Sequence, residues 1–162
     1  MSILVACIGN IFQGDDAFGC EVAKALSPGL ASEGVRVVDF GIRGLDLTYA
    51  LHDAPALTNL VYTVSRIGPP GTLYTIEPDL EDLEVGGEQM LDAHSMDPLQ
   101  VLRAVKAMGG TLGRVLLVGC EPADLGGEEG RMGLTAPVSN AIGQAAAMVE
   151  SLIHKELQEA YR

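Results

Sequence analysis

The sequence predicts one α/β domain with three layers, in which a mostly parallel, twisted sheet lies between two layers of helices. Short apolar runs typical of buried strands alternate with segments of helical periodicity along the 162 residues. That alternation is the pattern of a sheet built from strand–helix–strand units. No repeat, linker or low-complexity tract divides the sequence, so residues 1–162 are predicted to form a single domain.

Apolar runs locate the strands. A largely continuous run typifies a strand covered on both faces, and an alternating run typifies a strand with one exposed face. Continuous runs predict strands at residues 2–8, 35–40, 59–65 and 113–120, and an alternating run predicts another at 72–78. Ligands should then bind beyond the carboxyl ends of the parallel strands.

Helical periodicity and capping residues locate the helices. They are predicted at residues 17–26, 45–53, 98–108 and 137–160. The second is expected to place Leu45 and Tyr49 on one face. The third should begin sharply, because Asp97 suits the N-cap and Pro98 suits the first helical position. Residues 79–96 are acidic and aperiodic, which predicts a long loop.

Composition narrows the possible functions. The formal net charge of −12 would repel a phosphate-rich partner, so nucleic-acid binding is not expected. No window approaches the roughly 20 apolar residues of a membrane span, and the N-terminus lacks the basic region of a signal peptide. The 3 cysteines lack CxxC spacing, which favours neither a disulfide framework nor a zinc ribbon. We therefore expect a cytoplasmic protein without a membrane partner.

The segment GNIFQGDDAFG, residues 9–19, is the first candidate site because it follows the first strand. Its glycines do not form GxGxxG, and GDD stands where a Walker A loop has GK[ST], so phosphate binding is not favoured. Two acids before a helix have two explanations. Asp15 or Asp16 could cap the helix, or their carboxylates could form a cation site, and each acid could serve one purpose.

Histidine is a scarce candidate ligand, with 3 residues in the chain. His52 and His154 fall on predicted helices, where packing or solvent exposure is the ordinary explanation. His94 lies in the predicted loop, three residues before Asp97, and no apolar periodicity marks it as a core residue. A ligand role and an ordinary solvated or structural role both stay open for His94.

Four motifs in order carry a family resemblance: GNIFQGDDAFG, VDFGIRGLDL, PPGTLY and AHSMDPLQVL. Together they resemble the hydrogenase maturation endopeptidases, which trim the C-terminus of the [NiFe]-hydrogenase large subunit. The resemblance implies a single α/β/α domain that hydrolyses a peptide bond in the large-subunit precursor. The metal that it implies is nickel, already placed in that precursor, with no organic cofactor.

The resemblance also implies site residues. Catalytic positions map onto Asp16, Asp39 and His94, and the metal ligands among them onto Asp16 and His94. The glycine loop after the second strand maps onto substrate-binding positions at Gly41, Arg43 and Gly44, with Ile42 where the family usually has Thr.

Tyr62 departs from the family's pattern, because the family has a third metal-binding Asp at that position. A phenol with its reference pKa near 10 is a poor ligand for a divalent ion at neutral pH. Three interpretations stay open: an active protease that relies on precursor-borne nickel, a divergent member with altered metal use, or a degenerate, chaperone-like relative that binds the precursor without cleaving it. A thiol mechanism through Cys7 or Cys120 and a generic nucleotide-binding domain are further alternatives.

Overall fold

The central sheet of the computed structural model has five strands in the order β2-β1-β3-β5-β4. The structure describes residues 1–32, 34–83 and 96–161. Four strands are parallel to one another: β1 (Ile3–Ile8), β2 (Val35–Gly41), β3 (Leu57–Thr63) and β5 (Arg114–Cys120). The edge strand β4 (Leu73–Ile76) is antiparallel to β5. The predicted mostly parallel sheet is therefore confirmed.

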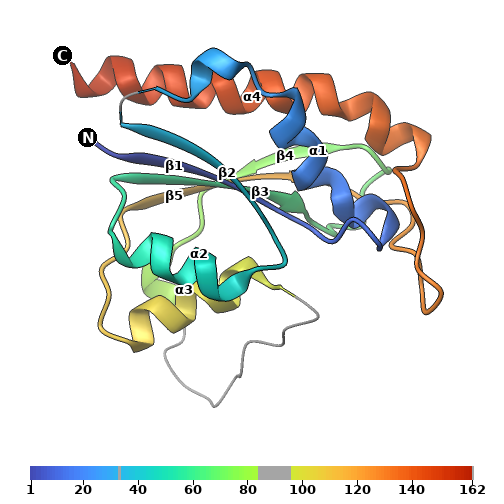
Figure 1. Cartoon of the computed structure of the whole chain (residues 1–162), viewed down its shortest axis with the longest axis horizontal. Helices are drawn as coiled ribbons and strands as arrows, with labels where there is room; N and C mark the ends of the chain where they lie inside the picture. The colour runs from blue at the N-terminus through green and yellow to red at the C-terminus, as the bar shows by residue number, and fades with distance from the viewer. Residues whose placement is uncertain (33, 84–95, 162) are drawn as a thin grey trace.

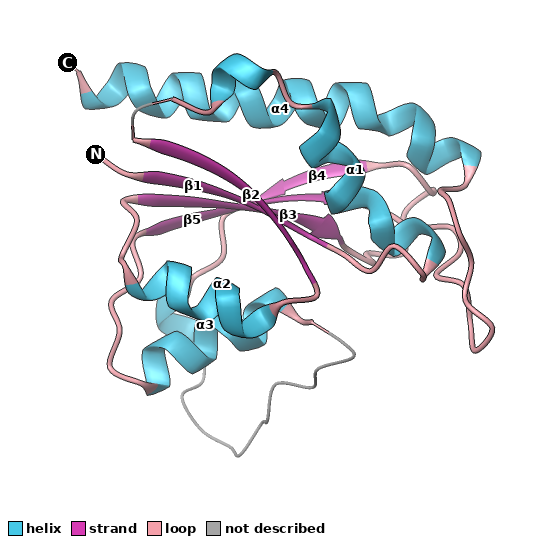
Figure 2. Cartoon of the chain, viewed as in Figure 1, coloured by secondary structure: helices cyan, strands magenta, loops and turns pink. Residues whose placement is uncertain are grey.

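Helices cover both faces of this sheet (Figure 1). The helices α1 (Phe18–Ala25) and α4 (Ala136–Ala160) lie on one face. The helices α2 (Gly44–His52) and α3 (Pro98–Ala107) lie on the other. Figure 2 shows the resulting three layers, with the sheet between the two helical layers. No helix in the described ranges is long and apolar enough to cross a membrane.

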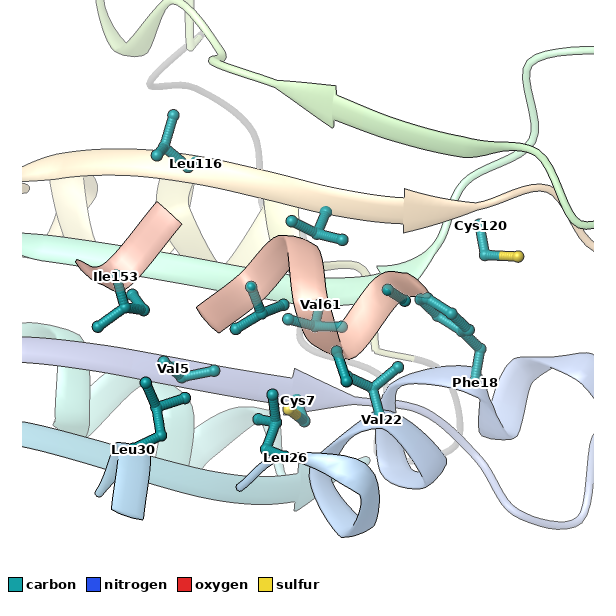
Figure 3. Close-up of a cluster of buried hydrophobic side chains, with 14 of the residues drawn as sticks. Val5, Cys7, Phe18, Val22, Leu26, Leu30, Val61, Leu116, Cys120 and Ile153 are labelled. Carbon is teal, nitrogen blue, oxygen red and sulfur yellow. The ribbon is translucent and has the colours of Figure 1, made fainter. Parts of the chain in front are cut away.

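The two faces of β1 explain why its sequence is apolar without interruption. Ile3, Val5 and Cys7 pack into the core beneath α1 and α4, which also holds Phe18 (Figure 3). The residues between them, Leu4, Ala6 and Ile8, belong to the second core, beneath α2 and α3. Period-two alternation sends successive side chains to opposite faces, so a strand covered on both sides needs apolar residues throughout.

The predicted start of α3 is confirmed, whereas the predicted face of α2 is not. Asp97 caps α3 as predicted, since its carboxylate accepts a hydrogen bond from the Leu99 N–H at 3.0 Å and Pro98 follows it. The predicted face of α2 is wrong: Leu45 and Tyr49 are exposed, and the helix buries Leu47, Thr48, Ala50 and Leu51. Both sets have helical spacing, and packing against the sheet and α3 selects the second.

The carboxyl ends of β1, β2, β3 and β5 meet at one edge of the sheet. The prediction for the third strand was shifted by two residues, because β3 ends at Thr63 and not at Ser65. The first glycine-rich segment begins at this edge, where a Cβ on Gly9 would overlap the backbone carbonyl of Asp16. A side chain there would therefore prevent the chain from folding back to place Asp16 beside the end of β1.

Candidate functional site

A cleft of about 450 Å³ opens at the carboxyl edge of the sheet. Its walls come from the loops after β1, β2 and β5, the end of β3 and the start of α3. The side chains that matter for its chemistry are Asp16, Ile42, Tyr62, Thr63, Asp97 and Leu125. The cleft therefore lies where an open parallel sheet is expected to bind its ligand.

Asp16 is held at this cleft by one hydrogen bond to each carboxylate oxygen. The Thr63 hydroxyl donates to Oδ1 at 2.9 Å, and the Asn10 N–H donates to Oδ2 at 3.0 Å. The residue belongs to a 3-10 turn (Gly14–Ala17) that precedes α1. Each carboxylate oxygen can accept a further partner, so Asp16 is oriented and still able to bind a cation or a proton donor.

Asp15 does not cap α1, so that interpretation is wrong. The residue is fully buried, and its carboxylate accepts hydrogen bonds from the loop after β5 and from the start of α4. The N–H groups of Ala123, Asp124 and Thr135 donate at 2.8, 3.0 and 2.7 Å, and the Thr135 hydroxyl donates as well. Burial alone would raise the pKa of Asp15, but these hydrogen bonds outweigh it and lower the pKa below its ordinary value.

Asp39 lies in a second, smaller hollow of about 280 Å³, next to the cleft. Its carboxylate accepts a hydrogen bond from the Gly41 N–H at 3.0 Å. Gly41 has a φ of 56°, a left-handed conformation that favours glycine, and this turn directs the loop across the edge of the sheet. The hollow and the cleft share Gly9, Asn10 and Ile42 in their walls, so Asp16 and Asp39 lie in adjoining depressions.

The remaining residues of the predicted glycine loop are placed by local contacts. The Arg43 guanidinium folds back on its own loop, where it donates to the carbonyls of Asp39 and Phe40 at 2.6 and 3.1 Å. It also pairs with Asp46 at 3.2 Å. Gly44 begins α2, and a Cβ there would lie 3.5 Å from the side chain of Met96. Arg43 thus stiffens the loop, whereas a side-chain methyl at Gly44 would make only an ordinary contact with Met96.

His94 lies outside the residues that the structure describes. Met96 and Asp97, which follow it in the sequence, line the cleft. The part of the site that His94 would supply therefore stays a prediction.

Tyr62 lies in the cleft and is half-buried against the core beneath α2 and α3. Burial and, to a smaller extent, the Asp97 carboxylate raise its pKa to about 12, against the opposing effect of Arg66. The phenol is therefore protonated near neutral pH and can donate a hydrogen bond. Within the described ranges, no group of three or more His, Cys, Asp and Glu side chains could hold a metal ion.

The cysteines do not support a thiol mechanism. Cys7, Cys20 and Cys120 are free and buried. Burial, reinforced by nearby carboxylates, raises the pKa of Cys7 and of Cys20 to about 12 and that of Cys120 to about 11. Because the thiolate is the reactive form, these thiols are poor nucleophiles at neutral pH.

Two anchoring residues were not predicted from the sequence. Thr63 orients Asp16, and Glu121, at the end of β5, accepts hydrogen bonds from the N–H groups of Arg66 at 2.9 Å and Gly68 at 2.6 Å. Ile67, between Arg66 and Gly68 in the chain, is fully exposed and has a φ of 60°. Glu121 and its partners lie more than 50 residues apart in the chain, so no local pattern could have revealed them.

Comparison with known proteins identifies the family. The family model for hydrogenase maturation proteases matches residues 20–152. The hydrogenase expression/formation protein HupD of Rhizobium leguminosarum bv. viciae is 34% identical over 145 residues, which cover 88% of this chain and 69% of that protein.

Solved structures agree with this match. The hydrogenase maturating endopeptidase HybD from Escherichia coli has a similar fold, with a TM-score of 0.76 and 23% identity, and the match covers 96% of this chain and 94% of that one. A hydrogenase 2 maturation peptidase from a Thaumarchaeota archaeon has a TM-score of 0.69 and 27% identity, with 94% and 98% covered. Since the family model spans most of the sequence and the cleft lies at the expected edge of the same fold, the chain belongs to the hydrogenase maturation protease family.

Proposed function

We propose that this chain is an endopeptidase that removes the C-terminal extension of a nickel-loaded [NiFe]-hydrogenase large-subunit precursor in the cytoplasm. One observation carries the proposal beyond family membership. Asp16 stands at an open cleft with both carboxylate oxygens oriented by the protein, through Thr63 and Asn10, and with capacity for a further partner. An oriented carboxylate at an open cleft suits a group that meets a substrate-borne cation.

The nickel ion is part of the substrate in this proposal. Asp16 and His94 are its proposed protein ligands, because Ni²⁺ accepts both carboxylate and imidazole donors. A metal ion in such a position polarises a carbonyl group or lowers the pKa of a bound water. Asp39, in the adjoining hollow, is the proposed third catalytic residue. Gly41, Arg43 and Gly44 shape the loop beside it and form the proposed wall for the substrate.

Tyr62 favours a second candidate function. A neutral phenol replaces the anionic ligand that the family resemblance implies, so the protein should contribute less to metal binding than a site with a third carboxylate. In the first candidate, the precursor supplies the missing affinity, and the Tyr62 hydroxyl donates a hydrogen bond to the substrate. In the second, the chain binds the precursor without cleaving it, as a chaperone-like relative.

Mass spectrometry of the precursor separates these candidates. A nickel-loaded large-subunit precursor is incubated with the natural protein, with Tyr62→Asp and with Asp16→Asn. Loss of a short C-terminal peptide with the natural protein but not with Asp16→Asn is the expected result for the protease. Cleavage by Tyr62→Asp alone would mean that Tyr62 has switched the site off. An intact precursor held in a stable complex by the natural protein would favour the chaperone-like function.

A further inference from the structure

Large apolar side chains are exposed around the cleft. Phe12 is 62% exposed and Met132 is 68% exposed, and Ile11, Ile42 and Leu125 are exposed beside them on the loops after β1, β2 and β5. We call these five residues the apolar rim. Exposed apolar groups that gather on one surface, and not singly, mark a site of interaction.

Backbone hydrogen bonds join the loop that carries Phe12 to the loop that carries Met132, so that the two loops form one surface. The Arg131 N–H donates to the Phe12 carbonyl at 2.9 Å, and the Gly14 N–H donates to the Arg131 carbonyl at 2.9 Å. Gln13 and Arg131 thereby form a parallel bridge. In Figure 1 the blue loop after β1 and the orange loop after β5 accordingly lie side by side. Phe12 is itself bonded to Arg131, and Met132 follows Arg131 directly, so the backbone fixes the relative position of the two residues.

Asp15 fixes the same two loops from beneath. Its carboxylate accepts from the N–H groups of Ala123, Asp124 and Thr135, and its own N–H donates to the Asp124 carbonyl at 2.9 Å. Leu125 follows directly and lines the cleft. The rim is therefore preorganised, which reduces the entropy that is lost when a partner binds.

The rim is continuous with both depressions of the site. Leu125 and Ile42 line the cleft that holds Asp16, and Ile42 and Phe12 line the hollow that holds Asp39. The rim therefore borders both depressions, and a peptide bound in either of them would lie beside it.

The charges beside the rim define the chemistry of its partner. Arg131 is paired with Asp124 at 3.1 Å and Arg43 with Asp46 at 3.2 Å. In the part of the chain that the structure describes, no salt bridge involves Asp16 or Asp39. The surface thus combines apolar side chains with two carboxylates that form no salt bridge within the described residues, which complements a peptide that carries apolar side chains next to a cation.

We propose that the apolar rim docks the segment of the precursor next to its nickel site, with apolar substrate side chains packed on Phe12 and Met132 while Asp16 faces the cation. This inference rests on the proposed function, because it names the surface that the same substrate uses. The aromatic ring of Phe12 and the flexible thioether of Met132 are of the kinds enriched where protein surfaces associate.

The test compares the natural protein with the double variant Phe12→Ser/Met132→Ser. The control is Met108→Ser, which removes a side chain of similar exposure, 55%, at the far end of α3. Cleavage of the nickel-loaded precursor is followed over a range of precursor concentrations. The double variant is expected to raise KM about tenfold or more, with a much smaller change in kcat, because truncation of central apolar contacts weakens association. Met108→Ser should match the natural protein.

Each of the other possible outcomes would overturn either the inference or the proposed function. A KM within twofold of the natural value in the double variant would overturn the inference and leave the proposed function standing. A natural protein that neither binds nor cleaves the precursor would overturn the proposed function and the inference with it. If sedimentation shows that the natural protein is a dimer and the double variant a monomer, with equal KM, the rim binds a second copy and the inference is wrong. Binding of the precursor without cleavage would overturn the protease function, and a Kd of the double variant within twofold of the natural value would then overturn the inference.

Discussion

Replacement of Asp15 by asparagine should destabilise the fold by about 3–4 kcal/mol. The carboxylate accepts on both oxygens, from the Ala123 and Asp124 N–H groups on Oδ2 and from the Thr135 N–H on Oδ1, and the Thr135 hydroxyl lies within hydrogen-bond distance of both. An amide presents one oxygen, so at best the two N–H groups on Oδ2 keep their acceptor. The Thr135 N–H then faces an NH₂ group and loses a bond to a charged acceptor, which costs about 2 kcal/mol. The two retained bonds become neutral and weaken by about 0.5–1 kcal/mol each.

Urea denaturation at pH 7, followed by far-ultraviolet circular dichroism, measures this difference. The exposed Asp53, at the end of α2, provides the control, since Asp53→Asn should stay within about 0.5 kcal/mol of the natural protein. An Asp15→Asn variant with the same free energy of unfolding as this control would refute the reasoning.

The pH dependence gives an independent check on Asp15. Its folded pKa is lowered, so its carboxylate stabilises the fold above the ordinary pKa of 3.8, and this contribution is lost as the pH falls through the folded value. The stability difference between the natural protein and Asp15→Asn should be constant from about pH 7 to pH 5 and shrink below about pH 4. A difference that persists unchanged at pH 3 would show that the charge is not its cause.

Three further predictions concern other residues. Tyr62→Asp should raise the affinity of the protein for nickel about tenfold, because a carboxylate replaces a protonated phenol; unchanged binding in calorimetry would remove Tyr62 from the metal site. Ile67→Asn should raise the free energy of unfolding by about 1 kcal/mol, because asparagine tolerates a φ of 60° better than a β-branched residue; a lower urea midpoint would contradict this. Iodoacetamide should leave precursor cleavage unchanged, because all the cysteines are buried; stoichiometric inactivation would restore the thiol mechanism.

The turn that holds Ile67 shows how one buried carboxylate shapes the connection between β3 and β4. Glu121 binds the N–H groups on both sides of Ile67, and this constraint accounts for a left-handed conformation that a β-branched side chain otherwise avoids. Glu121→Gln should therefore loosen the turn between β3 and β4. Hydrogen exchange at Arg66 and Gly68 would report that change directly, and unaltered exchange would assign the turn to other contacts.

Local and periodic features of the sequence were sufficient for the architecture. The unbroken apolar run of β1 requires cover on both faces, and the Asp97–Pro98 pair specifies the start of α3 through the chemistry of a single turn. The placement of Asp16 at the carboxyl edge follows from the same logic, because parallel strands end together.

The tertiary structure decided what depends on residues far apart in the chain. Asp15 and Asp16 are adjacent acids with the same local signal, yet Asp15 binds partners more than 100 residues away while Asp16 faces the cleft. The buried face of α2 was likewise selected by packing, because two sets of its residues have helical spacing. Periodicity and capping act within a few residues and are visible in sequence, whereas a hydrogen bond across the fold depends on which loops the sheet brings together.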